Sequence, residues 1–242
     1  MGVDASVLAS RRVAAFVALG AAVGTWFVVA PHLSPLHLWP AVIVVSAAVL
    51  PGTLLLVLVA LPLWTRRWLL PAAAALVLVA WGCEVENWGL AANFAKLWAA
   101  VFAGWAFMRL FEELSWVVVI AVVTPVVDAI SVWRGPTHAI TEHHFEVYTS
   151  VAIAFLVPGG GAAYLGPPDI LFYALFLAAA LRWRLRPVWT WVAMTGMYSL
   201  TIVVANAAEV GGLPALPFLS FGFLAANADL LWRRLRPAGR AA

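Results

Sequence analysis

Two aspartates stand within long apolar stretches, where charged side chains are rare. Asp128 lies in TPVVDAISVW (124–133) and is the only charged residue between Glu113 and Arg134. Asp169 follows two prolines at the start of another apolar stretch, PPDILFYALFLAAAL (167–181). An ionisable group in a membrane-spanning segment costs at least about 2.5–3.5 kcal/mol, so each aspartate is a candidate functional residue.

The expected depths of the two aspartates match. Counted along helices that start or end at the same interface, Asp128 and Asp169 lie about 7–10 Å below it. Two carboxylates that meet in a low dielectric share one proton, which leaves one acid and one base to activate water against a peptide carbonyl. Spacing alone leaves other roles open, because a buried aspartate also joins helices or lines an ion path, and Asp169 fits a first-turn helix cap.

The composition indicates an integral membrane protein. Of the 242 residues, 65% are hydrophobic and 10% are charged, whereas soluble domains average roughly 45–50% and 25%. The net charge is +3, and because its basic residues lie at the ends of apolar runs they indicate orientation and no nucleic-acid partner. Cys83 is the single cysteine, so an intrachain disulfide is excluded.

The lengths of the apolar runs predict an all-α membrane protein, a polytopic bundle of about eight transmembrane helices in a single domain spanning residues 1–242. No internal repeat divides the chain. The expected spans are 12–30, 39–63, 67–83, 89–108, 115–133, 164–182, 187–206 and 214–232.

The connections between these spans alternate in charge. Arginines flank the start of the first span and follow every second span, at Arg11, Arg12, Arg66, Arg67, Arg109, Arg182, Arg184, Arg186, Arg233, Arg234 and Arg236. The other connections are neutral or acidic apart from Arg134. By the positive-inside rule both termini are expected in the cytoplasm.

The loop 134–163 is the longest segment between spans. Its polar half contains HAITEHHFE (138–146), with three histidines but no metal-site spacing, and we interpret it as a polar loop. Its second half, VYTSVAIAFLVPGGG (147–161), is too short to cross a bilayer and is predicted to be a re-entrant or surface strand. The stretch 147–157 then offers an edge for an extended peptide.

A third motif opens the last span, which begins GGLPALPFLSFGFLAANADLLW (211–232). Two prolines near its start disrupt the first turn, or else mark an ordinary helix start. The remaining acids lie at span ends and are interpreted as interfacial, with Asp229 within reach of Arg233 four residues later.

These three motifs, in this order, resemble the presenilin and signal peptide peptidase family of intramembrane aspartyl proteases, especially the microbial presenilin homologues. That family carries a Tyr-Asp in one span, a Gly-x-Gly-Asp in the next and a Pro-Ala-Leu at the start of the last. The matching segments are VVDAISVW, LGPPDILF and LPALP, and the resemblance covers residues 124–235.

The resemblance implies roles for these positions. Asp128 and Asp169 would be the catalytic pair, in the catalytic spans 115–133 and 164–182, with the last catalytic span at 214–232 and the N-terminal spans within 12–108. Residues lining the substrate would be Gly166, Pro214, Ala215, Leu216 and Pro217. No metal and no other cofactor is implied. Substrates would be transmembrane helices or signal peptides within the lipid bilayer of a prokaryotic-type plasma membrane.

Two positions depart from the family pattern. Val127 stands where the family has tyrosine, and Pro168 replaces the glycine before the second aspartate. Loss of a hydroxyl beside one carboxylate and a fixed φ beside the other favour, as alternatives, a catalytically inactive scaffold or a transporter that binds protons or cations at the two aspartates. The sequence leaves the substrate, the oligomeric state and accessory subunits open.

Overall fold

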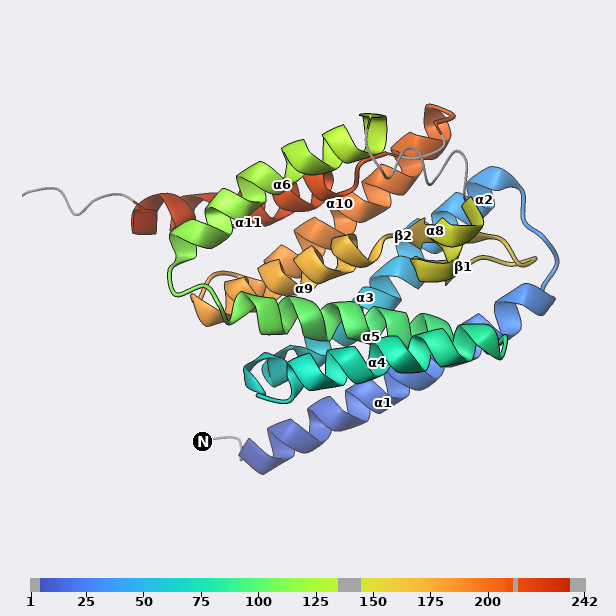
Figure 1. Cartoon of the computed structure of the whole chain (residues 1–242), viewed down its shortest axis with the longest axis horizontal. Helices are drawn as coiled ribbons and strands as arrows, with labels where there is room; N and C mark the ends of the chain where they lie inside the picture. The colour runs from blue at the N-terminus through green and yellow to red at the C-terminus, as the bar shows by residue number, and fades with distance from the viewer. Residues whose placement is uncertain (1–4, 135–144, 211–212, 236–242) are drawn as a thin grey trace, which may run out of the picture.

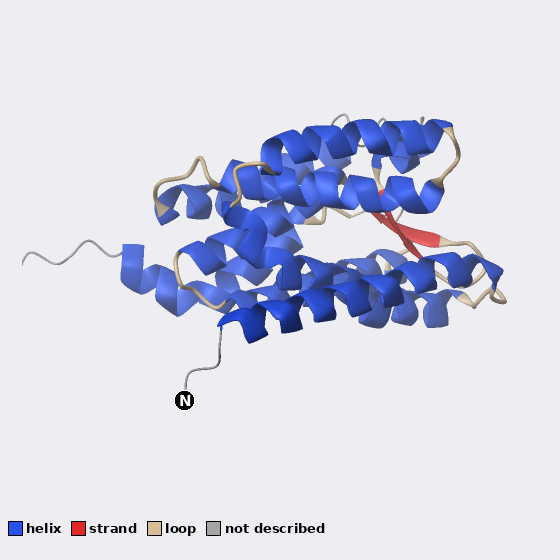
Figure 2. Ribbon diagram, turned by 90° about the horizontal axis from the view of Figure 1, so that it is seen from below, coloured by secondary structure: helices blue, strands red, loops and turns tan. Residues whose placement is uncertain are grey.

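The computed structural model describes residues 5–134, 145–210 and 213–235. It is 81% helical, and its long helices lie side by side in an elongated bundle (Figures 1 and 2). The α-helices are α1 (Ala5–Val29), α2 (Leu38–Val44), α3 (Leu50–Ala60), α4 (Leu69–Val85), α5 (Gly89–Met108), α6 (Leu114–Arg134), α8 (Phe145–Val151), α9 (Pro167–Arg182), α10 (Pro187–Ala207) and α11 (Leu216–Leu235). Short 3₁₀ turns follow α1 (η1, Ala30–His32) and α3 (η3, Leu61–Thr65), and a π-helical turn, η2 (Val45–Val49), joins α2 to α3.

Among the described residues, five helical segments are long and apolar enough to cross a membrane, which is compatible with an all-α membrane protein. They are Ser10–His32, Leu38–Thr65, Gly89–Met108, Leu114–Arg134 and Pro187–Ala207. The other three expected spans correspond to α4 and α9, which are shorter at 17 and 16 residues, and to α11, which carries three charged residues. The eight-span arrangement therefore stays a prediction.

One boundary differs clearly from its prediction, because α1 begins at Ala5 instead of residue 12. No glycine or proline occurs between Val3 and Leu19, so nothing in the sequence ends the helix at the membrane surface. Arg11 and Arg12 consequently lie within a helix and not before it.

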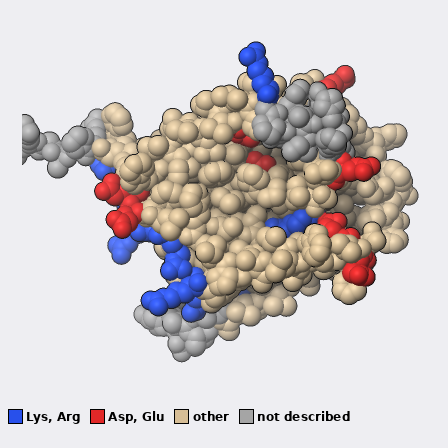
Figure 3. Space-filling view, in the orientation of Figure 1, with Lys and Arg blue, Asp and Glu red and all other residues tan. Residues whose placement is uncertain are grey.

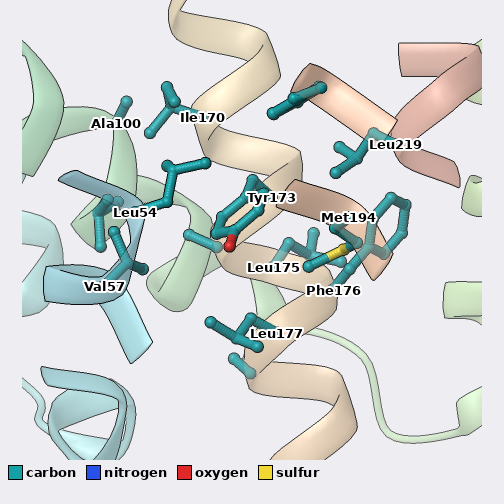
Figure 4. Close-up of a cluster of buried hydrophobic side chains, with 14 of the residues drawn as sticks. Leu54, Val57, Ala100, Ile170, Tyr173, Leu175, Phe176, Leu177, Met194 and Leu219 are labelled. Carbon is teal, nitrogen blue, oxygen red and sulfur yellow. The ribbon is translucent and has the colours of Figure 1, made fainter. Parts of the chain in front are cut away.

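Helix α9 lies at the centre of the bundle, and although it has only 16 residues it is surrounded by other helices. Residues Tyr173 to Ala180 are all buried, and they pack against residues of α3, α5, α10 and α11 (Figure 4). Gly104 of α5 permits the closest approach, because a Cβ there would lie 2.3 Å from the carbonyl oxygen of Leu171. Small residues at such crossings are typical of membrane helices.

Helix α10 is joined to the α2–α3 segment by two hydrogen bonds. The Ser199 hydroxyl donates to the carbonyl of Ser46 at 2.6 Å, and the Trp191 indole donates to the carbonyl of Leu54 at 3.1 Å. Ser46 lies in the π-helical turn η2, where the regular backbone pattern is interrupted. Side chains of α10 thus bind backbone oxygens that an apolar environment would leave without water.

The segment after α6 is only partly the strand predicted from the sequence. Residues 145–151 form the short helix α8, so the predicted strand over 147–157 is wrong in its first half. An antiparallel hairpin follows, β1 (Ile153–Leu156) and β2 (Ala162–Leu165), with Ile153 opposite Leu165. Strand propensity depends strongly on context, and here the last turn of α8 is bonded to α5, because Lys96 donates to the Ser150 carbonyl at 3.0 Å as well as to Glu84 at 2.7 Å.

Strand β1 is bonded on both of its sides. On the side facing away from β2, the Asn93 side chain accepts from the Ala154 N–H at 2.7 Å and donates to the Ala154 carbonyl at 3.0 Å. The Trp26 indole donates to the Leu156 carbonyl at 2.9 Å. An added strand would therefore extend the sheet beyond β2 and not beyond β1.

Most Lys and Arg side chains gather at one end of the bundle, which we call the arginine end (Figure 3). This end holds the start of α1, the η3–α4 and α9–α10 connections and the end of α11. Here Asp229 accepts from Arg233 at 3.2 Å, which confirms the predicted pair. Asp229 also accepts two bonds from Arg186 of the α9–α10 connection, at 2.7 and 2.9 Å, which sequence spacing did not indicate.

Candidate active site

Asp128 is half-buried on α6 and is held by the start of α11. Its carboxylate oxygen Oδ2 accepts a hydrogen bond from the backbone N–H of Leu216 at 3.0 Å. The first N–H groups of a helix have no partner within the helix and carry partial positive charge, so they suit a carboxylate. The structure thus joins the first and third motifs of the sequence, which are 88 residues apart.

The Pro-Ala-Leu motif forms the N-terminus of α11. Pro214, Ala215 and Leu216 are buried, and Pro217 is half-buried. The N–H of Leu219 donates to the carbonyl of Ala215, so Ala215 is the N-cap residue and Leu216 is the first helical residue. Pro214 therefore precedes the helix, whereas the sequence placed both prolines in its first turn.

Asp169 lies in the first turn of α9 and caps it. Its Oδ2 atom accepts from the backbone N–H of Gly166 at 2.9 Å, and a Cβ at Gly166 would lie 3.3 Å from that oxygen. The helix-cap role that the sequence left open is therefore present. It occupies one carboxylate oxygen and does not exclude a second role for the other.

Helix α9, which carries Asp169, contacts both α11 and α6, so the three motifs of the sequence lie on neighbouring helices. Each of the two carboxylates accepts a backbone N–H through Oδ2, and among the described residues no donor is found for Oδ1 of either aspartate. The two half-buried carboxylates thus belong to neighbouring helices, and each has one oxygen held in place by a backbone amide.

The departures Val127 and Pro168 have little effect on the backbone around the carboxylates. Val127 is 59% exposed and points away from the bundle. Pro168 lies at the second position of α9, where proline is tolerated because that N–H has no helical acceptor. The helix bearing Asp169 therefore starts regularly despite the replacement of glycine.

A tyrosine that the sequence analysis did not select lies in α8, just before the hairpin that leads to Asp169. Tyr148 of α8 is half-buried, and its ring meets that of Tyr164 edge-on at 6.4 Å. Burial, which is the largest cause, and the charges of Asp169 and Asp128 together raise the pKa of Tyr148 to about 12. Because its pKa lies far above neutral, the phenol keeps its proton. The sequence offered one signal for such a residue: Val127 stands where the resembled family has tyrosine, so a hydroxyl from another position was worth seeking.

Tyr198 of α10 is a second residue that sequence reasoning missed. It is fully buried, and its hydroxyl donates to the backbone carbonyl of Asp169 at 2.8 Å. Its ring stacks on that of Tyr173 at 5.9 Å, and the Tyr173 hydroxyl pairs with Thr195 at 2.8 Å. Tyr198 therefore fixes the first turn of α9 against α10, and no local motif marks it.

The described residues contain no group of three His, Cys, Asp or Glu side chains placed to hold a metal ion. The three histidines of the polar loop, His138, His143 and His144, lie outside the described residues. Comparison of the chain with known protein families, with curated proteins and with solved structures finds no match.

Replacing Tyr198 by phenylalanine is expected to slow any reaction at the two aspartates about tenfold, because the first turn of α9 loses the bond that fixes the Asp169 backbone. Tyr173→Phe is the matched control, since it also removes a buried hydroxyl from the same stacked pair. Both variants should lose about 1–3 kcal/mol of stability, measured by thermal unfolding in detergent. Equal turnover by the two variants would show that Tyr198 is structural only.

Proposed function

We propose that this protein is an intramembrane aspartyl protease. The observation that carries the proposal is the hydrogen bond from the Leu216 amide at the start of α11 to Asp128 of α6, together with the packing of both helices against α9, which carries Asp169. Two neighbouring carboxylates that share a proton provide both groups needed for peptide hydrolysis. One deprotonates water, and the other donates a proton to the carbonyl oxygen and later to the leaving amine.

Two contacts support this proposal by holding the carboxylates without neutralising them. The Leu216 and Gly166 amides bind one oxygen of each carboxylate, and neither aspartate pairs with a basic side chain among the residues described. Fixed donors next to a water-activating pair reduce the reorganisation needed in the transition state.

The proposed substrates are transmembrane helices or signal peptides. A peptide bond within a helix is shielded, so the substrate must be extended before cleavage. Strand β2 leads through Gly166 directly to Asp169, and the far side of β1 is bonded to Asn93 and Trp26. An extended substrate is therefore expected to add beside β2 by strand pairing, which would place it next to the carboxylates.

An active-site-directed inhibitor tests the proposal. A photoreactive hydroxyethylene peptide isostere, which mimics the tetrahedral intermediate, is expected to label the purified protein. Labelling should fall to background in Asp128→Ala, in Asp169→Ala and in the presence of excess unlabelled inhibitor. A proton- or cation-coupled transporter would not be labelled above background, and that result would favour the transport alternative.

The proposal includes eight spans, with both termini in the cytoplasm of a prokaryotic-type cell. In a Cys83→Ala background, a cysteine at Val147, which is 54% exposed on α8, should react with an impermeant maleimide added to intact cells. A cysteine at Thr65, which is exposed at the arginine end, should react only after the cells are opened. The reverse pattern, or equal labelling, would contradict this orientation.

A further inference from the structure

A groove lies at the arginine end, away from the candidate active site. It is formed by the start of α1, the end of α3 with η3, and the connection from α9 to α10, and its volume is about 410 Å³. Two of its ten lining residues are Arg11 and Arg12, and the other eight are apolar, among them Leu58, Leu181 and Val188. The protease proposal uses none of these residues.

Charge and apolar surface are separated along the helix axes within this groove. Arg11 and Arg12 lie near the end of the bundle, whereas Ala15 lies about one helical turn, or ~5 Å, further in. On the opposite wall, Leu58 is one turn further in than Pro62 at the bundle end. The groove therefore has cationic groups at the level of the membrane surface and apolar walls below them. A lipid has the matching arrangement, with a polar headgroup at the surface and an apolar chain below it.

The two guanidinium groups are not neutralised by the residues that the structure describes. Arg11 and Arg12 are exposed and form no ion pair there, whereas Arg186 and Arg233 at the same end bind Asp229. Guanidinium groups bind phosphate oxygens in a bidentate manner, and basic pockets between membrane helices bind anionic lipid headgroups. Val188 is 60% exposed, so the groove is open towards the surrounding lipid.

We propose that this groove binds an anionic glycerophospholipid from the leaflet at the arginine end. The phosphate lies between Arg11 and Arg12, and an acyl chain follows Ala15, Leu58 and Val188 into the membrane. Of the apolar helical segments around the groove, the α1 segment makes the least contact with the rest of the bundle, because only 17% of it is buried. The bound lipid fills the space between α1 and its neighbours α3 and α10.

Native mass spectrometry of the purified protein in neutral detergent tests this assignment. Phosphatidylglycerol is expected to bind more tightly than phosphatidylcholine of the same acyl composition. Removing both charges in Arg11→Gln/Arg12→Gln is expected to weaken phosphatidylglycerol binding about 30-fold, because each basic residue near a headgroup contributes about fivefold. Phosphatidylglycerol should also raise the unfolding temperature of the parent and not that of this variant.

The matched control is Arg66→Gln/Arg67→Gln, which removes two charges from the same end without touching the groove and should change binding less than about threefold. Ala15→Trp keeps every charge and fills the groove, so it should also weaken binding even if the double arginine variant fails to insert. Equal loss in both arginine variants, unchanged binding in Ala15→Trp, or displacement by soluble glycerol phosphate would each overturn the proposal.

Discussion

Purified protein carrying Asp128→Asn or Asp169→Asn is expected to cleave a single-span reporter at least about 10³-fold more slowly than the parent. Asparagine has nearly the shape of aspartate, and it can still accept the amides of Leu216 and Gly166 through its side-chain oxygen. It cannot take up or release the shared proton. The change therefore removes general acid and base catalysis, which contributes about 10²–10⁴-fold for each group, and preserves both helix contacts.

The double variant should be no slower than either single variant, because residues that act as one catalytic unit are strongly non-additive. Cleavage is measured in detergent and in proteoliposomes, with expression and unfolding temperature measured alongside. A structural role predicts a different pattern. Replacing a costly buried carboxylate by a neutral amide that keeps the cap would then leave function unchanged or stabilise the fold.

A parent protein that cleaves a panel of single-span substrates no faster than the double asparagine variant would contradict the protease proposal for those substrates. Proton or cation uptake by proteoliposomes distinguishes the two alternatives in that case. Uptake that depends on Asp128 and Asp169 supports a transporter. No uptake supports an inactive scaffold in which the carboxylates only cap helices α9 and α11.

The second large effect is expected at Leu216, where the backbone and not the side chain contacts Asp128. Leu216→Pro removes the N–H that donates to the carboxylate, at the first position of α11, where proline is well tolerated. A hydrogen bond to a charged group contributes about 1.5–3 kcal/mol, so turnover should fall about 10- to 100-fold.

Leu216→Ala is the control for this experiment, because it also removes the buried leucine side chain and keeps the N–H. The informative quantity is the ratio of kcat/KM between the proline and alanine variants, measured at equal amounts of folded protein. A ratio near one would mean that the Leu216 amide does not contribute to the reaction and that LPALP acts as an ordinary helix start.

The sequence alone predicted an all-α membrane protein and the approximate positions of its long helices. Hydrophobic stretches near the length needed to cross a bilayer, separated by arginines and prolines, locate helices because in lipid every backbone polar group must be bonded within its own segment. The predicted pair Asp229–Arg233 followed from helical spacing for the same reason, since both residues belong to one helix. These features depend on local chemistry, and apart from the start of α1 the long helices lie within a few residues of the predicted spans.

Contacts between distant segments were decided only by the tertiary structure. The FEVYTSV segment forms helix α8, and the last turn of this helix accepts a hydrogen bond from Lys96, about 50 residues earlier in the chain. The hydroxyl of Tyr198 donates to the Asp169 carbonyl, and Arg186 binds Asp229 of another helix. The periodicity of a sequence does not show how two helices are rotated relative to each other, so it does not predict these pairs. Asn93 closes one side of strand β1 in the same way. Packing of small residues such as Gly104 sets these rotations, so the partners of each polar side chain follow from the assembled bundle and not from spacing along the chain.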